Sequence, residues 1–208
     1  MSVRVKLCGI TRLEDALAAV DAGVDALGFV FVPGTPRFIT AEAGRMIRSA
    51  LPPFITTVGL FVDAEPAFVE EYLRVSRVQV AQFHGDESPG VVASYRDRVR
   101  VIKAFRVRGP ETLAALAGYR DSVDAILLDA FVAGAHGGTG ARFDWDLAIE
   151  ARSAGRPLIL AGGLNPENVA EAVRRVNPYA ADVSSGVEVS PGRKDPAKVR
   201  AFLEAARG

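Results

Sequence analysis

The sequence predicts an α/β protein, a (β/α)8 TIM barrel that spans residues 1–208 as a single domain. Eight short apolar runs rich in β-branched residues alternate with segments of helical period. Each run is too continuously apolar for a half-exposed antiparallel sheet, so we expect parallel strands that are buried on both faces. Eight β/α units in about 200 residues match the small end of this class of barrel.

The competing architecture is a doubly wound open sheet, which is also built from alternating strands and helices. Two observations weigh against it. The Gly-x-Gly-x-x-Gly turn is absent after the first run, and eight strands would be many for such a sheet. No linker or low-complexity segment divides the chain, so a closed barrel remains the better prediction.

The predicted strands follow in order along the chain. Their residue ranges are 3–9, 25–31, 55–62, 78–84, 99–105, 123–130, 156–163 and 179–186.

The predicted helices are marked by apolar period and by their ends. Thr11 and Glu14 have the spacing of a capping box, and Asn165 precedes a proline at a first helical position. Gly23 and Gly155 follow helices, where a left-handed residue is often needed. The positions with helical period are Leu13, Ala16, Leu17 and Val20, then Val169, Val173 and Val176, then Val199, Phe202 and Leu203.

Composition excludes several classes of function. Lys and Arg together number 25, as do Asp and Glu, so nothing indicates a nucleic-acid tract or a membrane-binding face. The only cysteine excludes an internal disulfide framework. No run reaches the roughly 18 apolar residues of a membrane span, and the first residues carry no signal-peptide core. We therefore expect a cytoplasmic protein.

In a barrel, the active site lies at the carboxyl ends of the strands. Cys8 ends the first predicted strand and shares a face with Lys6, because side chains alternate along a strand. An unpaired cysteine is often a small buried hydrophobe, but at a strand tip it faces the ligand cavity. A nearby lysine favours the thiolate, so Cys8 is a candidate nucleophile or proton carrier.

Two aspartates end other strands. Asp129 follows a strongly apolar run, where an acid is costly to bury unless it is paired, hydrogen-bonded or protonated. It is either a structural cap or ion pair, or a functional acid whose raised pKa would suit proton donation. Asp182 ends the eighth run and is either a substrate contact or the structural partner of Lys6 or Lys103.

Glycine turns after the seventh and eighth runs predict a phosphate site. Barrels often bind phosphate there, on backbone amides and on the start of a short extra helix. Gly162 and Gly163 form the first turn, and Ser185 and Gly186 lie in the second.

Two loops are candidate substrate covers. Residues 32–40 carry Arg37, which is either a bidentate clamp for a carboxylate or a solvated surface side chain. Residues 131–143 hold four glycines and resemble a mobile lid. His84, at the tip of the fourth strand, and His136 are the only histidines, too few for a three-histidine zinc site. We therefore expect no metal.

Several segments carry a resemblance to a known family. "KLCGIT", "GFVFVPGTPRFI", "QFHGDE", "LLDA", "GGTGARFDW", "LAGGLNPENV" and "DVSSGVEVSPGRKD" follow one another in order, and together they resemble phosphoribosylanthranilate isomerase of tryptophan biosynthesis. The resemblance covers essentially the whole chain. It implies an enzyme without a cofactor that converts N-(5-phosphoribosyl)anthranilate to 1-(2-carboxyphenylamino)-1-deoxyribulose 5-phosphate by an acid–base Amadori rearrangement.

The same resemblance implies roles for individual residues. Cys8 would be the general base and Asp129 the general acid. Contacts with the substrate would come from Arg37 on the anthranilate carboxylate, from His84 and from Asp182 on the sugar. Phosphate would lie on Gly162, Gly163, Ser185 and Gly186.

Two alternatives stay open. One is another sugar-phosphate barrel enzyme, an epimerase or a synthase, and the other is a non-catalytic phospho-ligand-binding barrel. In every case the expected partner is a small phosphorylated molecule, not nucleic acid or a membrane. The chain is expected to be a monomer or a homodimer.

Overall fold

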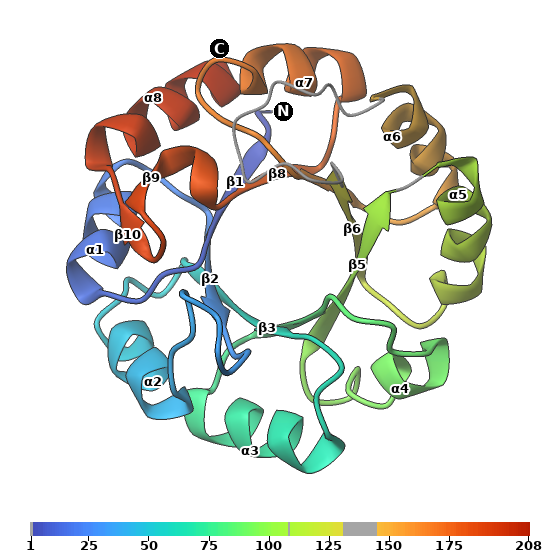
Figure 1. The fold of residues 1–208 in the computed structure, drawn as a ribbon, viewed down its shortest axis with the longest axis horizontal. Helices are drawn as coiled ribbons and strands as arrows, with labels where there is room; N and C mark the ends of the chain where they lie inside the picture. Colours follow the sequence, from blue (N-terminus) through green and yellow to red (C-terminus); the bar gives the residue numbers. More distant parts are fainter. Residues whose placement is uncertain (1, 108, 131–144) are drawn as a thin grey trace.

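The computed structural model describes residues 2–107, 109–130 and 145–208. Eight parallel strands form a closed barrel in chain order, and β8 pairs with β1 (Figure 1). The predicted fold is therefore confirmed, because one strand lies at each expected apolar run, although β5 continues two residues past the predicted end at Phe105. The strands are β1 Arg4–Cys8, β2 Ala26–Val30, β3 Thr56–Phe61, β4 Val80–Phe83, β5 Arg100–Val107, β6 Ala125–Ala130, β7 Leu158–Ala161 and β8 Ala180–Val183.

The helices form an outer ring around the barrel (Figure 1). Their bounds are α1 Leu13–Asp21, α2 Ala41–Ser49, α3 Pro66–Ser76, α4 Pro89–Ala93, α5 Pro110–Leu116, α6 Trp145–Ala151, α7 Val169–Val176 and α8 Pro196–Arg207. Short 3-10 helices are η1 Ala117–Tyr119, η2 Arg152–Ala154 and η3 Ser185–Val187. The candidate lid, residues 131–143, and His136 lie outside the described residues.

The expected start of α1 was partly wrong. Arg12 is its N-cap residue, and the capping box does not form because the Thr11 hydroxyl donates to the carbonyl of Gly192 at 2.6 Å. Leu13 and Leu17 are exposed, while the buried face of the helix includes Ala16. Thr11 therefore makes a distant contact where a local cap was predicted. Small residues of α1, such as Ala16, face the sheet where the leucines were predicted to do so.

The start of α7 was also predicted too early. Its N-cap residue is Asn168, so Pro166 lies in the turn before the helix and not at the first helical position. The Asn165 side chain accepts hydrogen bonds from the amides of Glu167 and Asn168, in the turn before α7. Gly23 and Gly155 both have positive φ, as expected for residues that end helices.

The apolar core has two layers. The larger layer lies between the barrel and the helices and includes Phe29, Phe31, Phe61 and Phe83. The smaller layer fills the barrel interior with side chains such as Leu127. The interior layer closes the barrel below the strand tips, so a ligand has access only from above it.

A small hairpin was not expected from the sequence. β9 (Glu188–Ser190) and β10 (Arg193–Lys194) pair antiparallel after η3, and Pro191 and Gly192 lie between them. Lys194 joins this hairpin to the start of α1, because its amide donates to Asp15 Oδ2 at 3.0 Å. The hairpin thereby lies beside the carboxyl end of β1 (Figure 1).

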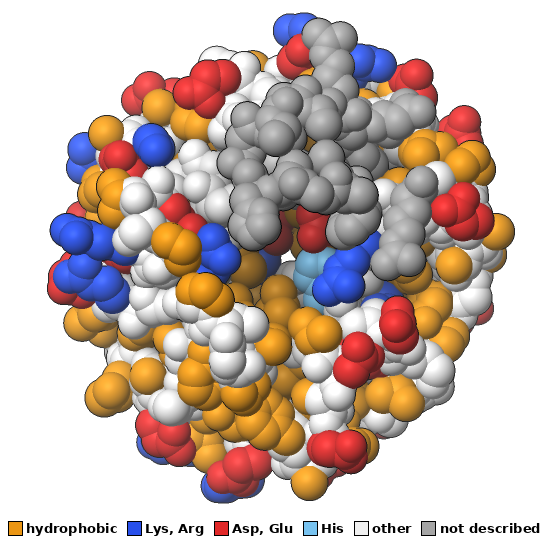
Figure 2. Space-filling view, viewed as in Figure 1, with side chains coloured by type: hydrophobic (Ala, Val, Ile, Leu, Met, Phe, Trp, Pro, Cys, Tyr) orange, Lys and Arg blue, Asp and Glu red, His pale blue; other side chains and the backbone are white. Residues whose placement is uncertain are grey.

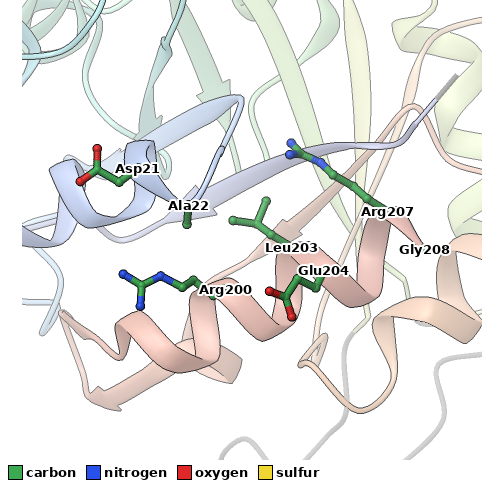
Figure 3. A pocket seen from close by; sticks show the side chains of 7 residues that line it. All are labelled: Asp21, Ala22, Arg200, Leu203, Glu204, Arg207 and Gly208. Carbon is green, nitrogen blue, oxygen red and sulfur yellow. The ribbon is translucent and has the colours of Figure 1, made fainter.

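A groove of about 430 Å³ lies between the carboxyl-terminal ends of α1 and α8. Asp21 and Ala22 line one side, and Leu203 and Arg207 belong to the other (Figure 3). Because the helices run antiparallel to the strands, this groove belongs to the amino-terminal end of the barrel, away from the strand tips. Among the described residues, none of the helices is both long enough and apolar enough to cross a membrane.

Candidate active site

A cavity of about 460 Å³ opens at the carboxyl ends of the strands. Figure 2 shows a hollow near the centre of this face, with acidic, cationic and histidine side chains around it. Nearly all of the predicted site residues line the cavity, and Gly186 is the exception. The lining residues that were predicted are Cys8, Arg37, His84, Asp129, Gly162, Gly163, Asp182 and Ser185.

Cys8 ends β1 and is only 6% exposed. Burial raises the pKa of its thiol, and the charge of Asp182 adds to the shift, while Lys6 and Lys194 oppose it. The expected effect of Lys6 therefore has the right direction, but it does not outweigh desolvation. The resting group is accordingly a thiol whose thiolate, once formed, is a strong base.

Lys6 and Asp182 form an ion pair inside the barrel, with Nζ and Oδ2 2.9 Å apart. Lys6 is therefore the structural partner of Asp182. Lys103 instead contacts Glu87, at 3.1 Å, outside the barrel wall. Burial raises the pKa of Asp182 against the opposing effect of Lys6. One carboxylate oxygen is held in this pair, and the residue still lines the cavity.

Asp129 lies close to His84, with Oδ2 and Nε2 3.3 Å apart. Its side chain is 32% exposed, so the cost of burying this acid is smaller than the apolar run suggested. The contact is an ion pair only when the imidazole is protonated. The two groups nevertheless place a carboxyl and an imidazole together at the mouth of the cavity.

Three polar atoms at this site form no hydrogen bond with the described residues. They are Gln82 Oε1, Asp182 Oδ1 and His84 Nε2, and all three residues line the cavity. His84 Nε2 lies 3.3 Å from Asp129 Oδ2 but does not form a hydrogen bond with it. Buried polar atoms are almost always hydrogen-bonded, so orphaned ones in a cavity mark places where a bound molecule can supply the partner. A polar ligand with hydroxyl groups fits this arrangement.

The phosphate turns have the predicted backbone. Gly162 and Gly163 both have positive φ, and a Cβ added at Gly163 would meet no atom within 4 Å. η3 begins at Ser185, so a short extra helix follows β8 as expected. Gly186 has no room for a side chain, because a Cβ there would lie 2.0 Å from the carbonyl oxygen of Leu164.

Arg37 reaches the cavity but is already paired. Its Nε and Nη2 donate to the two carboxylate oxygens of Glu188 at 2.9 and 2.6 Å. This bond raises the pKa of Arg37, which stays charged. Arg37 is therefore not a freely solvated surface side chain, and its remaining N–H groups are the ones that a ligand can reach.

Sequence reasoning missed other residues at the site. Gln82 and Arg106 line the cavity, and Glu188 and Lys194 lie beside it. Period two along β5 was a usable signal, because Ala104 faces the interior and Arg106 follows two residues later. The strand tip was instead placed at Phe105, whose ring packs against Tyr119, 5.1 Å between centroids.

Among the described residues, no group of three His, Cys, Asp or Glu side chains is arranged to hold a metal ion. The site instead offers one thiol, carboxyl groups, an imidazole and glycine turns at the mouth of a parallel barrel. Fold and site together define a (β/α)8-barrel enzyme with acid–base groups at its strand tips.

Comparison with known proteins gives the particular family. A family model described as N-(5'phosphoribosyl)anthranilate (PRA) isomerase matches residues 5–205. A relative from Geobacter sp. (strain M21), named N-(5'-phosphoribosyl)anthranilate isomerase, is 57% identical over 204 residues, 98% of each chain.

Solved structures agree with that match. The phosphoribosyl anthranilate isomerase of Thermotoga maritima has a TM-score of 0.93 and 43% identity, with 99% of each chain covered. A structure of a phosphoribosyl anthranilate isomerase in complex with reduced 1-(o-carboxyphenylamino)-1-deoxyribulose 5-phosphate has a TM-score of 0.89 and 42% identity, again over 99% of each chain. The chain belongs to the N-(5'-phosphoribosyl)anthranilate isomerase family, so the resemblance seen in the sequence is confirmed, and the protein is an isomerase.

Proposed function

We propose that Cys8 and Asp129 carry the acid–base chemistry of this isomerase. The reaction converts N-(5-phosphoribosyl)anthranilate to 1-(2-carboxyphenylamino)-1-deoxyribulose 5-phosphate, a step of tryptophan biosynthesis. The observation that carries the proposal is that the chain's only cysteine and a strand-tip carboxyl face one cavity. The other barrel enzymes and the phospho-ligand sensor have no need of this pair.

The rearrangement needs an acid and then a base. Asp129 gives a proton to the ring oxygen, the C1′–O bond breaks, and the nitrogen lone pair forms an iminium. The Cys8 thiolate then removes the C2′ proton, which the adjacent iminium has made acidic, and leaves an enolamine. Protonation of that enolamine at C1′ and loss of the hydroxyl proton give the ketone. All steps transfer protons without net oxidation, so the proposed mechanism uses no cofactor.

The remaining site residues bind the substrate in this proposal. Asp182 accepts a hydrogen bond from a sugar hydroxyl through its unpartnered oxygen, and His84 binds the substrate beside Asp129. Arg37 binds the anthranilate carboxylate with the N–H groups that Glu188 leaves open. The phosphate lies on Gly162, Gly163, Ser185 and Gly186, where backbone amides and the start of η3 favour an anion.

The test is a pair of substitutions in the two reacting groups. Cys8→Ser keeps the shape but replaces the thiol with a far weaker base, so kcat should fall by at least about 10²-fold with KM changed little. Asp129→Asn should lose as much or more, because an amide cannot donate an acidic proton. Turnover is followed through product fluorescence, and circular dichroism verifies folding. Wild-type turnover of folded Cys8→Ser would mean that the thiol is only a packing group.

The setting of the enzyme is also part of the proposal. Residues 1–208 act as one domain in the cytoplasm, on a small phosphorylated substrate, without nucleic acid or membrane. The chain works as a monomer or a homodimer, and light scattering on the purified protein distinguishes these two states.

A further inference from the structure

Glu188 is a buried carboxylate at the centre of a small charge network. Its side chain is 4% exposed and lies between Arg37 and Lys194. Oε1 accepts hydrogen bonds from Arg37 Nε at 2.9 Å, from Lys194 Nζ at 2.8 Å and from the Gly192 amide at 3.3 Å. Oε2 accepts from Arg37 Nη2 at 2.6 Å. Four hydrogen bonds, three on Oε1 and one on Oε2, therefore hold this carboxylate in place.

Lys194 connects this carboxylate to the strand that carries the base. Its Nζ, only 1% exposed on the side chain, donates to the backbone carbonyl of Cys8 at 2.5 Å and to that of Ser184 at 3.2 Å. Burial lowers the pKa of Lys194, and Glu188 opposes that shift. The ammonium is thus a three-way link between the ends of β1 and β8 and the hairpin.

The aliphatic part of the Arg37 side chain also contacts the end of β1. It passes directly over Gly9, the residue after Cys8, where an added Cβ would lie 2.6 Å from Arg37 Cδ. Gly9 also has a φ of 78°, so a side chain is disfavoured there twice. Arg37 is therefore linked to the end of β1 in two ways. Its aliphatic carbons pack against Gly9, and its guanidinium is connected to the Cys8 carbonyl through hydrogen bonds of Glu188 and Lys194.

A clamp of this kind has an energetic purpose. A free arginine side chain loses much of its rotamer entropy when it is fixed. Here the bidentate bond to Glu188 fixes the guanidinium before a ligand arrives, so that cost does not fall on substrate binding. Arg37 and Lys194 together also exceed Glu188 by one positive charge, which favours an anion beside them.

We propose that Glu188 is a positioning residue for substrate recognition. It holds Arg37 in the orientation that binds the aryl carboxylate and, through Lys194, sets the distance of that guanidinium from Cys8. The inference rests on the proposed role of Arg37. Glu188 itself does not touch the substrate, because its oxygens are occupied by Arg37, Lys194 and Gly192.

The test compares two substrates in three variants. Glu188→Gln, Arg37→Ala and the double variant are assayed with the natural aminoaldose phosphate and with the analogue made from aniline, which lacks the carboxylate. Glu188→Gln should raise KM for the carboxylated substrate by about tenfold, which is the usual effect of losing one charge-assisted hydrogen bond. The value of kcat should change less than about threefold, because the reacting groups are untouched. The aniline analogue should show little change in KM. The double variant should lose no more than Arg37→Ala alone, because Glu188 acts through Arg37.

Asp124→Asn is the matched control. Asp124 likewise binds an arginine, Arg100, at 2.9 Å and a backbone amide, that of Val101, but at the amino-terminal ends of β5 and β6. Asp124→Asn should lower the melting temperature, and it should leave the ratio of the KM values for the two substrates unchanged. Glu188→Asp, which keeps the charge beside Lys194, replaces Glu188→Gln if the latter does not fold, and it should show the same preference more weakly.

The outcomes separate the inference from the function on which it rests. Equal losses on both substrates in folded Glu188→Gln, with selective loss in Arg37→Ala, would overturn the positioning role and leave Arg37 as the carboxylate contact. Equal losses in Arg37→Ala would overturn the role of Arg37 and the inference with it. Turnover by the wild type on the natural substrate tests the isomerase activity independently of both.

Discussion

At the scale of single residues, the environment of Cys8 decides how the base works. The thiol is buried, and burial raises its pKa more than Lys6 and Lys194 lower it. Lys6 is less effective than its position on the same strand face suggests, because Asp182 neutralises its charge at 2.9 Å. A raised pKa makes the thiolate scarce at neutral pH but more basic when present.

We therefore predict that the thiolate of Cys8 forms only at alkaline pH. Because the pKa of the thiol is raised, the thiolate fraction should grow about tenfold per pH unit below that pKa, and the growth should continue past the ordinary thiol value of about 8.5. The rate at which iodoacetamide alkylates Cys8, the only cysteine in the sequence, follows this fraction between pH 6 and 9.5. A plateau of the alkylation rate below pH 7 would show that Lys6 and Lys194 outweigh the effect of burial.

At the scale of elements, η3 and the hairpin after it organise one side of the site. η3 follows β8 and packs so closely on the loop after β7 that Gly186 has no room for a side chain. The hairpin then brings Glu188 and Lys194 back over the end of β1. The phosphate end and the carboxylate end of the proposed site are thus built from neighbouring short elements.

Gly186→Ala tests this close packing. Its Cβ would lie 2.0 Å from the carbonyl oxygen of Leu164, which is backbone and cannot rotate away, so η3 must shift. We expect a loss of about 1–3 kcal/mol in unfolding free energy and a raised KM for the phosphorylated substrate. Urea denaturation and steady-state kinetics measure the two effects.

Gly163→Ala provides the contrast for this prediction. A Cβ at Gly163 meets open space, so the cost there is only the positive φ of 63°, about 1–2 kcal/mol. A Gly186→Ala protein with unchanged stability and unchanged KM would show that η3 moves freely.

At the scale of the whole molecule, most of the buried apolar core lies outside the barrel wall. A row of aromatic rings packs between the sheet and the helices, with Phe61 5.5 Å from Phe31 and 5.9 Å from Phe83 between centroids. Phe61 is fully buried in this layer, and the ring points away from the catalytic cavity because it alternates with the interior-facing Leu60. Folding and chemistry therefore use opposite faces of the same strand.

Phe61→Ala should lower stability but leave turnover nearly unchanged. Removing a buried aromatic ring typically costs about 3–5 kcal/mol, since the cavity left behind refills only in part. The rate at a temperature where the variant is folded should stay within about threefold of wild type, because no cavity contact is lost. Thermal denaturation and kcat at 20 °C measure both. A large loss of kcat in folded protein would show that the outer core also sets the site geometry.

Much of the fold and part of the site were predictable from the sequence. The eight β-branched runs, their apolar continuity and their alternation with helical periods determined a parallel barrel, since these patterns are local consequences of side-chain direction. Once the barrel was inferred, strand ends such as Cys8, Asp129 and Asp182 had to converge at one face. Their convergence followed from topology rather than from any contact visible in the sequence.

Only the tertiary structure decided the partners of these residues. Arg37 and Glu188 are 151 positions apart, and Lys6 and Asp182 are 176 apart, so no local pattern links them. The same applies to the Thr11 hydroxyl, which donates to the distant carbonyl of Gly192 and does not form the local cap predicted for α1. Sequence periodicity determines which way a side chain points, whereas the identity of its partner and the net shift of its pKa depend on groups that only the closed barrel brings within hydrogen-bonding distance.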